Sequence, residues 1–131
     1  MAKNKSYIEV FDPIFGGCFR LFAGAESVTD FLNQKHIDKE DRLGFEETIQ
    51  NLSGLTHNGK SDGISIWIRN ADLTADTISV LAHEVNHATQ FHLFDNCNVD
   101  YREVETPSYY IQFLMYNFLK KLRKKNADKA V

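Results

Sequence analysis

The chain has few of the residues that mark several classes of protein. Its 131 residues include only 2 prolines and 2 cysteines. Cys18 and Cys97 lie far apart in sequence and form no CxxC pair, so we expect neither a disulfide framework nor a cysteine-based zinc site. We therefore expect a cytoplasmic protein. No apolar run is long enough to span a bilayer, and the first residues lack the apolar core of a signal peptide, so no membrane partner is expected.

The chain also lacks a large excess of positive or negative charge. The 15 basic and 18 acidic residues leave a net charge of −3, which does not favour a nucleic-acid partner. The hydrophobic share of 43% and the charged share of 25% are typical of a globular chain, and the length suits one domain, residues 1–131.

The first part of the chain predicts a β-hairpin followed by a short helix. Residues 7–11 and 18–22 alternate between apolar and polar positions, and Asp12-Pro13 and Gly16-Gly17 supply turn residues between them. Ser27 or Thr29 is a candidate cap for a helix that carries Val28, Phe31 and Leu32. Residues 36–44 resemble a loop or a solvated helix end, and residues 45–55 fit no single element.

The second part predicts one strand and two helices. Asn58 to Gly63 forms a turn, and Ile64–Arg69 follows as a strand with isoleucines on one face. A helical period runs from Ala75 to about Phe94, and a second amphipathic helix runs from Tyr109 to Leu122. The basic segment from about 120 to 131 is expected to be a frayed, solvated tail. Together these elements predict an α+β fold.

The informative motif is His83-Glu84-Val85-Asn86-His87, inside the first long helix. At about 100° per residue, His83 and His87 stand one turn apart on one face, which suits two ligands of one zinc ion. Glu84 is displaced to the side, where a general base can reach a metal-bound water. A chance match is expected in about one such sequence in a hundred.

The face of the helix opposite the histidines is apolar. Ile78, Leu81, Ala82 and Val85 form the predicted core-facing stripe, so the histidine pair is expected to face a cleft. The alternative is that both histidines are ordinary surface residues of a metal-free protein, which elemental analysis would reveal.

A zinc site that performs hydrolysis needs a third protein ligand and an open position. The downstream candidates are His92, Asp95, Asp100, Glu103 and Glu105. His92 falls on the side of Val85, away from the pair, and is expected at the edge of the core; Asp95 is expected to end the helix. Glu103 and Glu105 both lie where the chain enters the last helix, and both remain candidates.

The motif, preceded by a strand and followed by a glutamate at the next helix, resembles the gluzincin zinc metallopeptidases, and most closely the small minigluzincin-like proteins of phage and bacterial genomes. The resemblance covers roughly residues 64 to 119. It implies a zincin-like fold, zinc bound by His83, His87 and Glu105, and Glu84 as general base. In that family an aromatic often follows the third ligand by four residues, as Tyr109 follows Glu105. The resemblance also implies that strand 64–69 is the sheet edge along which an extended peptide binds.

Pro107 departs from the expected pattern. A proline is tolerated only in the first turn of a helix. If the last helix instead begins at Asp100, Asp100 and Glu103 form a capping box, Pro107 kinks the helix, and Glu103 is structural.

Two functions follow from these residues. The first is a zinc-dependent hydrolase, most simply a peptidase, in which Tyr109 or Tyr110 helps to polarise the scissile carbonyl. The second is a non-catalytic zinc-containing adaptor or inhibitor, encoded by a phage, that keeps the fold. Arg69 is a candidate for orienting a substrate carboxylate, and Trp67 either lines a pocket or packs on the other face of the sheet. The sequence predicts neither the substrate nor the oligomeric state.

Overall fold

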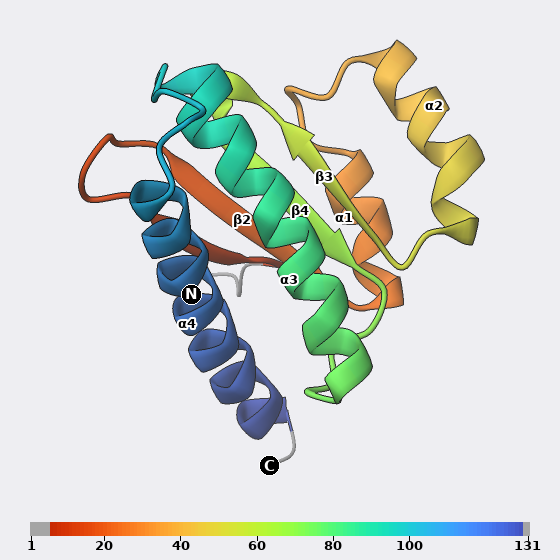
Figure 1. The fold of residues 1–131 in the computed structure, drawn as a ribbon. Coiled ribbons are helices and arrows are strands. Elements are labelled where there is room, and N and C mark those ends of the chain that lie inside the picture. The colour runs from red at the N-terminus through yellow and green to blue at the C-terminus, as the bar shows by residue number, and fades with distance from the viewer. Residues whose placement is uncertain (1–5, 130–131) are drawn as a thin grey trace, which may run out of the picture.

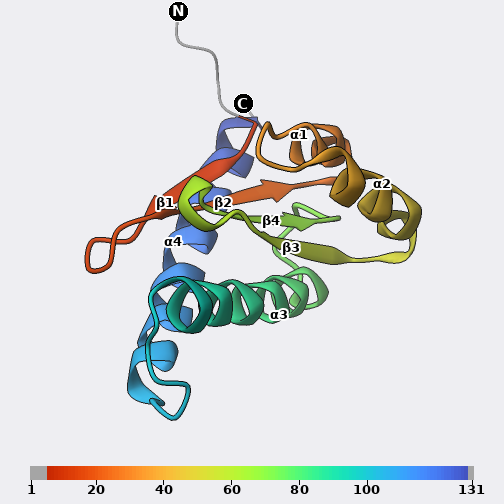
Figure 2. The same ribbon diagram turned by 90° about the horizontal axis from the view of Figure 1, so that it is seen from above.

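The computed structural model describes residues 6–129, which form a four-stranded mixed sheet with helices on both faces (Figures 1 and 2). The strands are β1 (Ile8–Phe11), β2 (Cys18–Ala23), β3 (Gly54–Asn58) and β4 (Ile64–Ile68). Their order across the sheet is β1-β2-β4-β3, with β2 and β4 parallel and the two outer pairs antiparallel. The predicted α+β class and the predicted hairpin of β1 and β2 are confirmed.

The strand after the Asn58–Gly63 turn lies inside the sheet. Every residue of β4 is buried, because β2 pairs with it on one side and β3 on the other. The prediction that strand 64–69 is the sheet edge is therefore wrong. The edge strands are β1 and β3, and the edge beside β4 is β3, whose residues are only partly buried and which the sequence did not predict as a strand.

The sheet separates two apolar clusters. Helices α1 (Val28–Leu32) and α2 (Lys39–Thr48) lie over one face, where Trp67 of β4 packs with Phe31 (Figure 2). Helices α3 (Ala75–Gln90) and α4 (Glu105–Lys129) cover the other face, where the isoleucines of β4 meet Val85 and Leu114. Short 3₁₀ turns lie at Ala25–Ser27, Ile49–Asn51 and Lys60–Asp62. Trp67 thus packs on the face opposite the histidine helix.

Residues 36–44, expected as a loop or a solvated helix end, include a short loop and the first part of the solvent-exposed helix α2, which continues to Thr48. Asp38 caps its N-terminus, accepting a hydrogen bond from the Asp41 amide at 2.8 Å. None of its ten residues is buried. Its position on the sheet therefore depends on few contacts.

Helix α3 begins where the sequence predicts it, with Thr74 as the N-cap, and passes into a π-helical segment, Phe91–Asn96. Such wider turns are uncommon and often adjoin functional sites. The segment turns the chain back toward the start of α4 (Figure 1).

Helix α4 begins at Glu105, so Pro107 lies in its first turn, where a proline needs no hydrogen-bonded amide. A start at Asp100 is therefore wrong. The segment from residue 120, expected as a frayed tail, is helical through Lys129, with Leu122 buried and the Asn126 side chain donating to the Ala71 carbonyl at 2.8 Å. Over residues 6–129, no helix is both long and apolar enough to cross a membrane.

Candidate metal centre

His83 and His87 turn their ring nitrogens toward each other on the exposed side of α3. The two Nε2 atoms are 3.1 Å apart, and the rings meet edge to face with centroids 4.7 Å apart. Two nitrogens bound to one tetrahedral zinc ion at 2.0–2.1 Å lie about 3.3 Å apart. The pair therefore has nearly the spacing that one zinc ion requires, and its nitrogens are accessible to solvent ions because both residues are exposed.

Glu84 lies on a different side of α3 from the histidines, against the edge strand. It is 6% exposed. The Thr56 hydroxyl of β3 lies 2.9 Å from the Glu84 carboxylate and 3.2 Å from the Glu84 main-chain oxygen, and can donate its proton to either. Thr56 thus fixes the carboxylate between α3 and β3, a role that the sequence did not predict.

Gly54 allows β3 to approach α3 this closely. A Cβ atom at this position would lie 2.9 Å from Glu84 Cγ and 3.0 Å from Val80 Cγ1, closer than real Cβ atoms come to such neighbours. The absent side chain leaves a notch in which the Glu84 side chain is packed.

The third ligand is not assembled around the histidines. Glu105 is the first residue of α4 and is exposed, and its amide donates to the Glu103 carboxylate at 3.1 Å. In the part of the chain that the structure describes, no three His, Cys, Asp or Glu side chains are grouped so that they could hold a metal ion. Glu105 as the third ligand stays a prediction.

Glu103 instead serves the helix. Its carboxylate accepts a hydrogen bond from the Glu105 amide, one of the main-chain donors that the first turn of α4 leaves without a helical partner. Asp100 is engaged by Arg102, whose Nη2 donates to it at 2.8 Å, rather than by the helix. Glu103 is therefore a structural residue in this arrangement, although both carboxylates remain exposed.

The two tyrosines after Glu105 differ in environment. Tyr109 is 50% exposed, lies one turn after Glu105 and stacks on Phe113. Tyr110 is buried and donates to the Asp12 carboxylate at 2.9 Å. Burial and this carboxylate raise the pKa of Tyr110 well above its ordinary value. Of Tyr109 and Tyr110, Tyr109 is therefore the one that a ligand at the solvent-exposed surface can reach.

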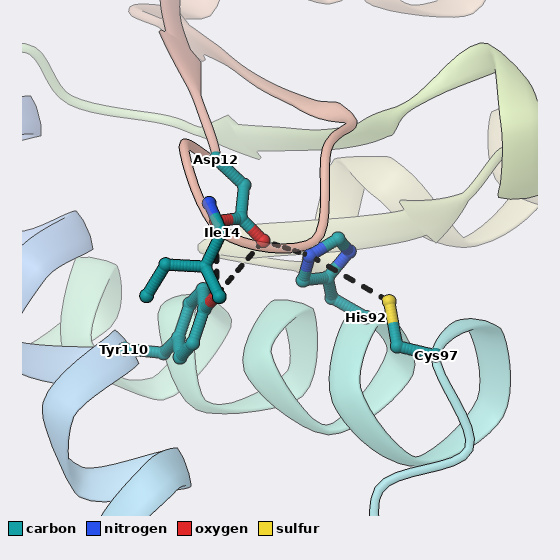
Figure 3. A network of polar contacts seen from close by, with 5 residues as sticks. All are labelled: Asp12, Ile14, His92, Cys97 and Tyr110. Atoms are coloured by element: carbon teal, nitrogen blue, oxygen red, sulfur yellow. Dashed lines mark hydrogen bonds and ion pairs between the residues drawn. The ribbon is translucent and has the colours of Figure 1, made fainter.

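Asp12 and His92 form a buried polar network with Tyr110 (Figure 3). His92 Nε2 lies 2.7 Å from the Asp12 carboxylate, and the Ile14 amide donates to the same carboxylate at 2.8 Å. Burial favours the neutral acid, but the hydrogen bonds from His92, Ile14 and Tyr110 outweigh burial and lower the pKa of Asp12. The network ties the β1–β2 loop to the end of the histidine helix and to α4. His92 lies at the core edge, as predicted.

Cys97 adjoins this network without acting as a nucleophile in it. Its Sγ lies 3.9 Å from His92 Nε2, the nitrogen that already contacts Asp12. Burial and the Asp12 charge raise the pKa of the Cys97 thiol, which disfavours the reactive thiolate. A cavity of about 760 Å³ lies nearby, with Phe15, Asn58 and His92 among its lining residues.

Arg69 is occupied by main-chain oxygens. Its Nη2 donates to the carbonyls of Ile49 and Leu52, both at 2.7 Å, and its guanidinium lies over the Trp67 ring at 5.1 Å. These contacts close the connection between α2 and β3, so the geometry does not favour a role for Arg69 with a substrate carboxylate.

The comparisons with known proteins give no assignment for this arrangement: no protein-family model, curated protein or solved structure matches the chain.

Proposed function

We propose that this protein is a zinc-dependent hydrolase that cleaves peptide bonds, built on a zincin-like arrangement of sheet and motif helix. The observation that carries the proposal is the 3.1 Å separation of the His83 and His87 Nε2 atoms, with Glu84 in the next helical position. One imidazole can also donate a hydrogen bond to the other at this distance, so the spacing supports the proposal together with the full motif and not by itself.

The donor set fits zinc chemically. His83 and His87 would hold the ion, and Glu105 would supply the carboxylate oxygen that completes a ligand set of two histidines and one acid. When bound, zinc acts as a Lewis acid toward the scissile carbonyl and lowers the pKa of its water. Glu105 is exposed at the start of α4, and it would have to change rotamer to join the histidines.

Glu84 is the general base of the proposal. Its carboxylate accepts the proton of the attacking water and passes it to the departing amine. Thr56 is a positioning residue, because its hydroxyl holds the Glu84 carboxylate at 2.9 Å. Tyr109, half exposed beside the start of α4, donates its phenolic proton to the developing oxyanion.

The substrate in this proposal is an extended peptide that pairs with β3. Within residues 6–129, β3 pairs with β4 alone, and we propose that the peptide pairs with the main-chain groups of its other side. Gly54 and Thr56 of β3 contact Glu84, and a peptide on this edge would run beside the base. We also propose a cytoplasmic location, since two cysteines far apart in sequence do not indicate the disulfide framework of a small secreted domain.

A non-catalytic zinc-binding protein is the second candidate, and one observation favours it. The Glu84 carboxylate is packed into the Gly54 notch and bonded to Thr56, contacts that also suit a purely structural residue. In this case zinc stabilises the fold and the protein acts by binding a partner.

The test combines metal analysis with hydrolysis of fluorescently labelled casein. Untagged protein purified without chelator should contain one zinc ion per chain and degrade casein. Glu84→Gln should keep the zinc and lose about 10²–10⁴-fold in rate, while His83→Ala should lose both. Glu46→Gln, an exposed glutamate on α2, is the matched control and should behave as wild type.

Each other result decides against the hydrolase. Zinc in the wild type with equal casein rates in wild type and Glu84→Gln would favour the binding protein. Protein that takes up no zinc from buffered Zn²⁺ would show that the motif is accidental.

A further inference from the structure

His36 and His57 form a second histidine pair, on the face of the sheet opposite the candidate metal centre. His36 lies in the loop between α1 and α2, and His57 lies in β3. Their ring centroids are 5.5 Å apart. His36 Nε2 and His57 Nδ1 are both buried and, among the residues that the structure describes, have no hydrogen-bond partner. Buried polar atoms of this kind usually have a partner, so the pair calls for a physical explanation.

The pair lies under a weakly held helix. No residue of α2 is buried, and its Phe45 ring packs edge-on against His57 with centroids 5.8 Å apart. Phe45 also contacts Phe31 of α1 at 6.3 Å. His57 is thus the residue of the edge strand against which the one aromatic side chain of α2 rests. A helix with so few buried contacts is readily released.

The charges that face His36 come from three sides. Asp62, before β4, favours the protonated ring, while Arg20 of β2 opposes it. Asp30 and Lys35 line the same surface pocket as His36. Burial has the largest effect, and it lowers the pKa of His36 below its ordinary value.

The charges that face His57 come from its partner and from α2. Burial again has the largest effect, and His36 adds to it, so the pKa of His57 is also lowered. Asp41 and Asp38, at the start of α2, act in the opposite direction without outweighing burial. Both rings are therefore neutral at neutral pH.

We propose that His36 and His57 act as an acid-sensitive latch that holds α2 and the loop before it on the edge strand. While both rings are neutral they pack against each other and against Phe45. Protonation places two like charges 5.5 Å apart, in a site where His36 Nε2 and His57 Nδ1 have no hydrogen-bond partner among the described residues. Acid then favours a state in which α2 leaves the sheet and both rings reach water.

The direction of the pH effect follows from linkage. Because the folded-state pKa values lie below about 6.5, the unfolded or released state binds protons first as the pH falls. The latch contributes its stability above about pH 6.5 and loses it as the pH falls through the folded-state pKa values.

Alternation along β3 connects the latch with the candidate metal centre. Thr56 faces Glu84 on one side of the strand, and His57, the next residue, faces α2 on the other. Release of α2 would thus remove its packing from one face of the strand that positions Glu84, while the pairing of β3 with β4 remains. This consequence for catalysis rests on the proposed function, whereas the latch itself does not.

The test measures the latch without any substrate. Ring signals of His36 and His57 are titrated by NMR, and amide hydrogen exchange of α2 is compared at about pH 7.5 and about pH 5, after correction for intrinsic rates. We expect both rings to titrate below about 6.5. We also expect α2 protection to fall about tenfold or more at the lower pH, while α3 keeps its protection.

Two variants separate the latch from general acid sensitivity. His57→Phe keeps a ring against Phe45 but removes one titrating group and the like charge beside His36, so the pH dependence of α2 protection should become clearly smaller than in wild type. Asp95→Asn changes an exposed titratable residue away from both histidine pairs and should leave the pH response of α2 unchanged. Titration of both wild-type rings at or above about 6.5, or an undiminished response in His57→Phe, would overturn the proposal. Neither result bears on zinc or hydrolysis.

Discussion

The Thr56 hydroxyl lies 2.9 Å from the Glu84 carboxylate and so joins the edge strand of the sheet to the helix that carries the histidine pair. The two residues are 28 positions apart in sequence. Their contact makes the placement of the candidate base a property of two elements, since a shift of β3 along α3 would move the hydroxyl away from the carboxylate.

Replacement of Thr56 tests this contact directly. Thr56→Val leaves the buried Glu84 carboxylate without its hydroxyl donor, and we expect the free energy of unfolding to fall by about 1–3 kcal/mol. Thr56→Ser should recover most of the loss because it restores the hydroxyl. Urea denaturation measures each value, with Thr48→Val, at an exposed position of α2, as the control. A Thr56→Val loss no larger than the Thr48→Val loss would contradict the assignment.

Two glycines in opposite settings test the notch. Gly54→Ala places a Cβ 2.9 Å from Glu84 Cγ, so we expect a loss of about 1–3 kcal/mol in stability from the forced shift of α3 or β3. Gly44 lies in α2, where an added Cβ would meet nothing within 4 Å, and Gly44→Ala should stabilise by about 0.5–1 kcal/mol. Thermal melts of both variants give the comparison.

The Gly54→Ala loss should also depend on Glu84. In a double-mutant cycle, Glu84→Ala removes the clashing Cγ and should make the Gly54→Ala penalty smaller. Additive effects of the two substitutions would mean that the notch does not accommodate Glu84.

Local sequence patterns predicted the elements that depend on local physics. Period-two alternation identified the β1–β2 hairpin, and the helical period from Ala75 identified α3. The four-residue spacing of His83 and His87 was sufficient to predict their convergence, because both lie on one rigid helix.

The errors arise from contacts between distant segments. The central place of β4 depends on its parallel pairing with β2, about 45 residues earlier in the chain, which no local pattern encodes. The strand β3 escaped prediction because it is short and half-buried, with Thr, His and Asn among its five residues. Thr56 and Gly54 were missed with it. The Asn58-Gly59 turn directly after His57 is nevertheless a signal that a strand comes before it.

The choice between Glu105 and Glu103 as third ligand has a direct test. Glu105→Gln should weaken zinc binding more than the 10–100-fold typical of residues that only support a ligand. Glu103→Gln should keep both zinc affinity and stability, because its amide oxygen still accepts from the Glu105 amide. Competition with a chromophoric chelator measures affinity, and the zinc-induced rise in melting temperature provides a second reading. The reverse order of the two variants would assign the site to Glu103.

The buried Asp12 network predicts a second pH effect, in a range more acidic than that of the latch. The pKa of Asp12 is lowered, because hydrogen bonds from His92, Ile14 and Tyr110 outweigh burial. A carboxyl with a depressed folded-state pKa binds protons more weakly in the folded than in the unfolded protein. Its contribution to stability is therefore complete above the ordinary pKa of about 4 and is lost as the pH falls through the folded-state value.

Asp12→Asn separates this effect from the general acid sensitivity of the chain. The amide keeps the shape of the side chain but not its charge, so we expect a loss of about 1–3 kcal/mol at pH near 7 and a smaller further loss between about pH 5 and pH 3 than in wild type. Urea denaturation across this range gives both curves, and Asp95→Asn, at an exposed position after α3, is the control. Asp95 is a suitable control because it differs from Asp12 chiefly in burial and in partners. Parallel curves of unfolding free energy against pH for Asp12→Asn and wild type would mean that the Asp12 carboxylate does not anchor the β1–β2 loop through its charge.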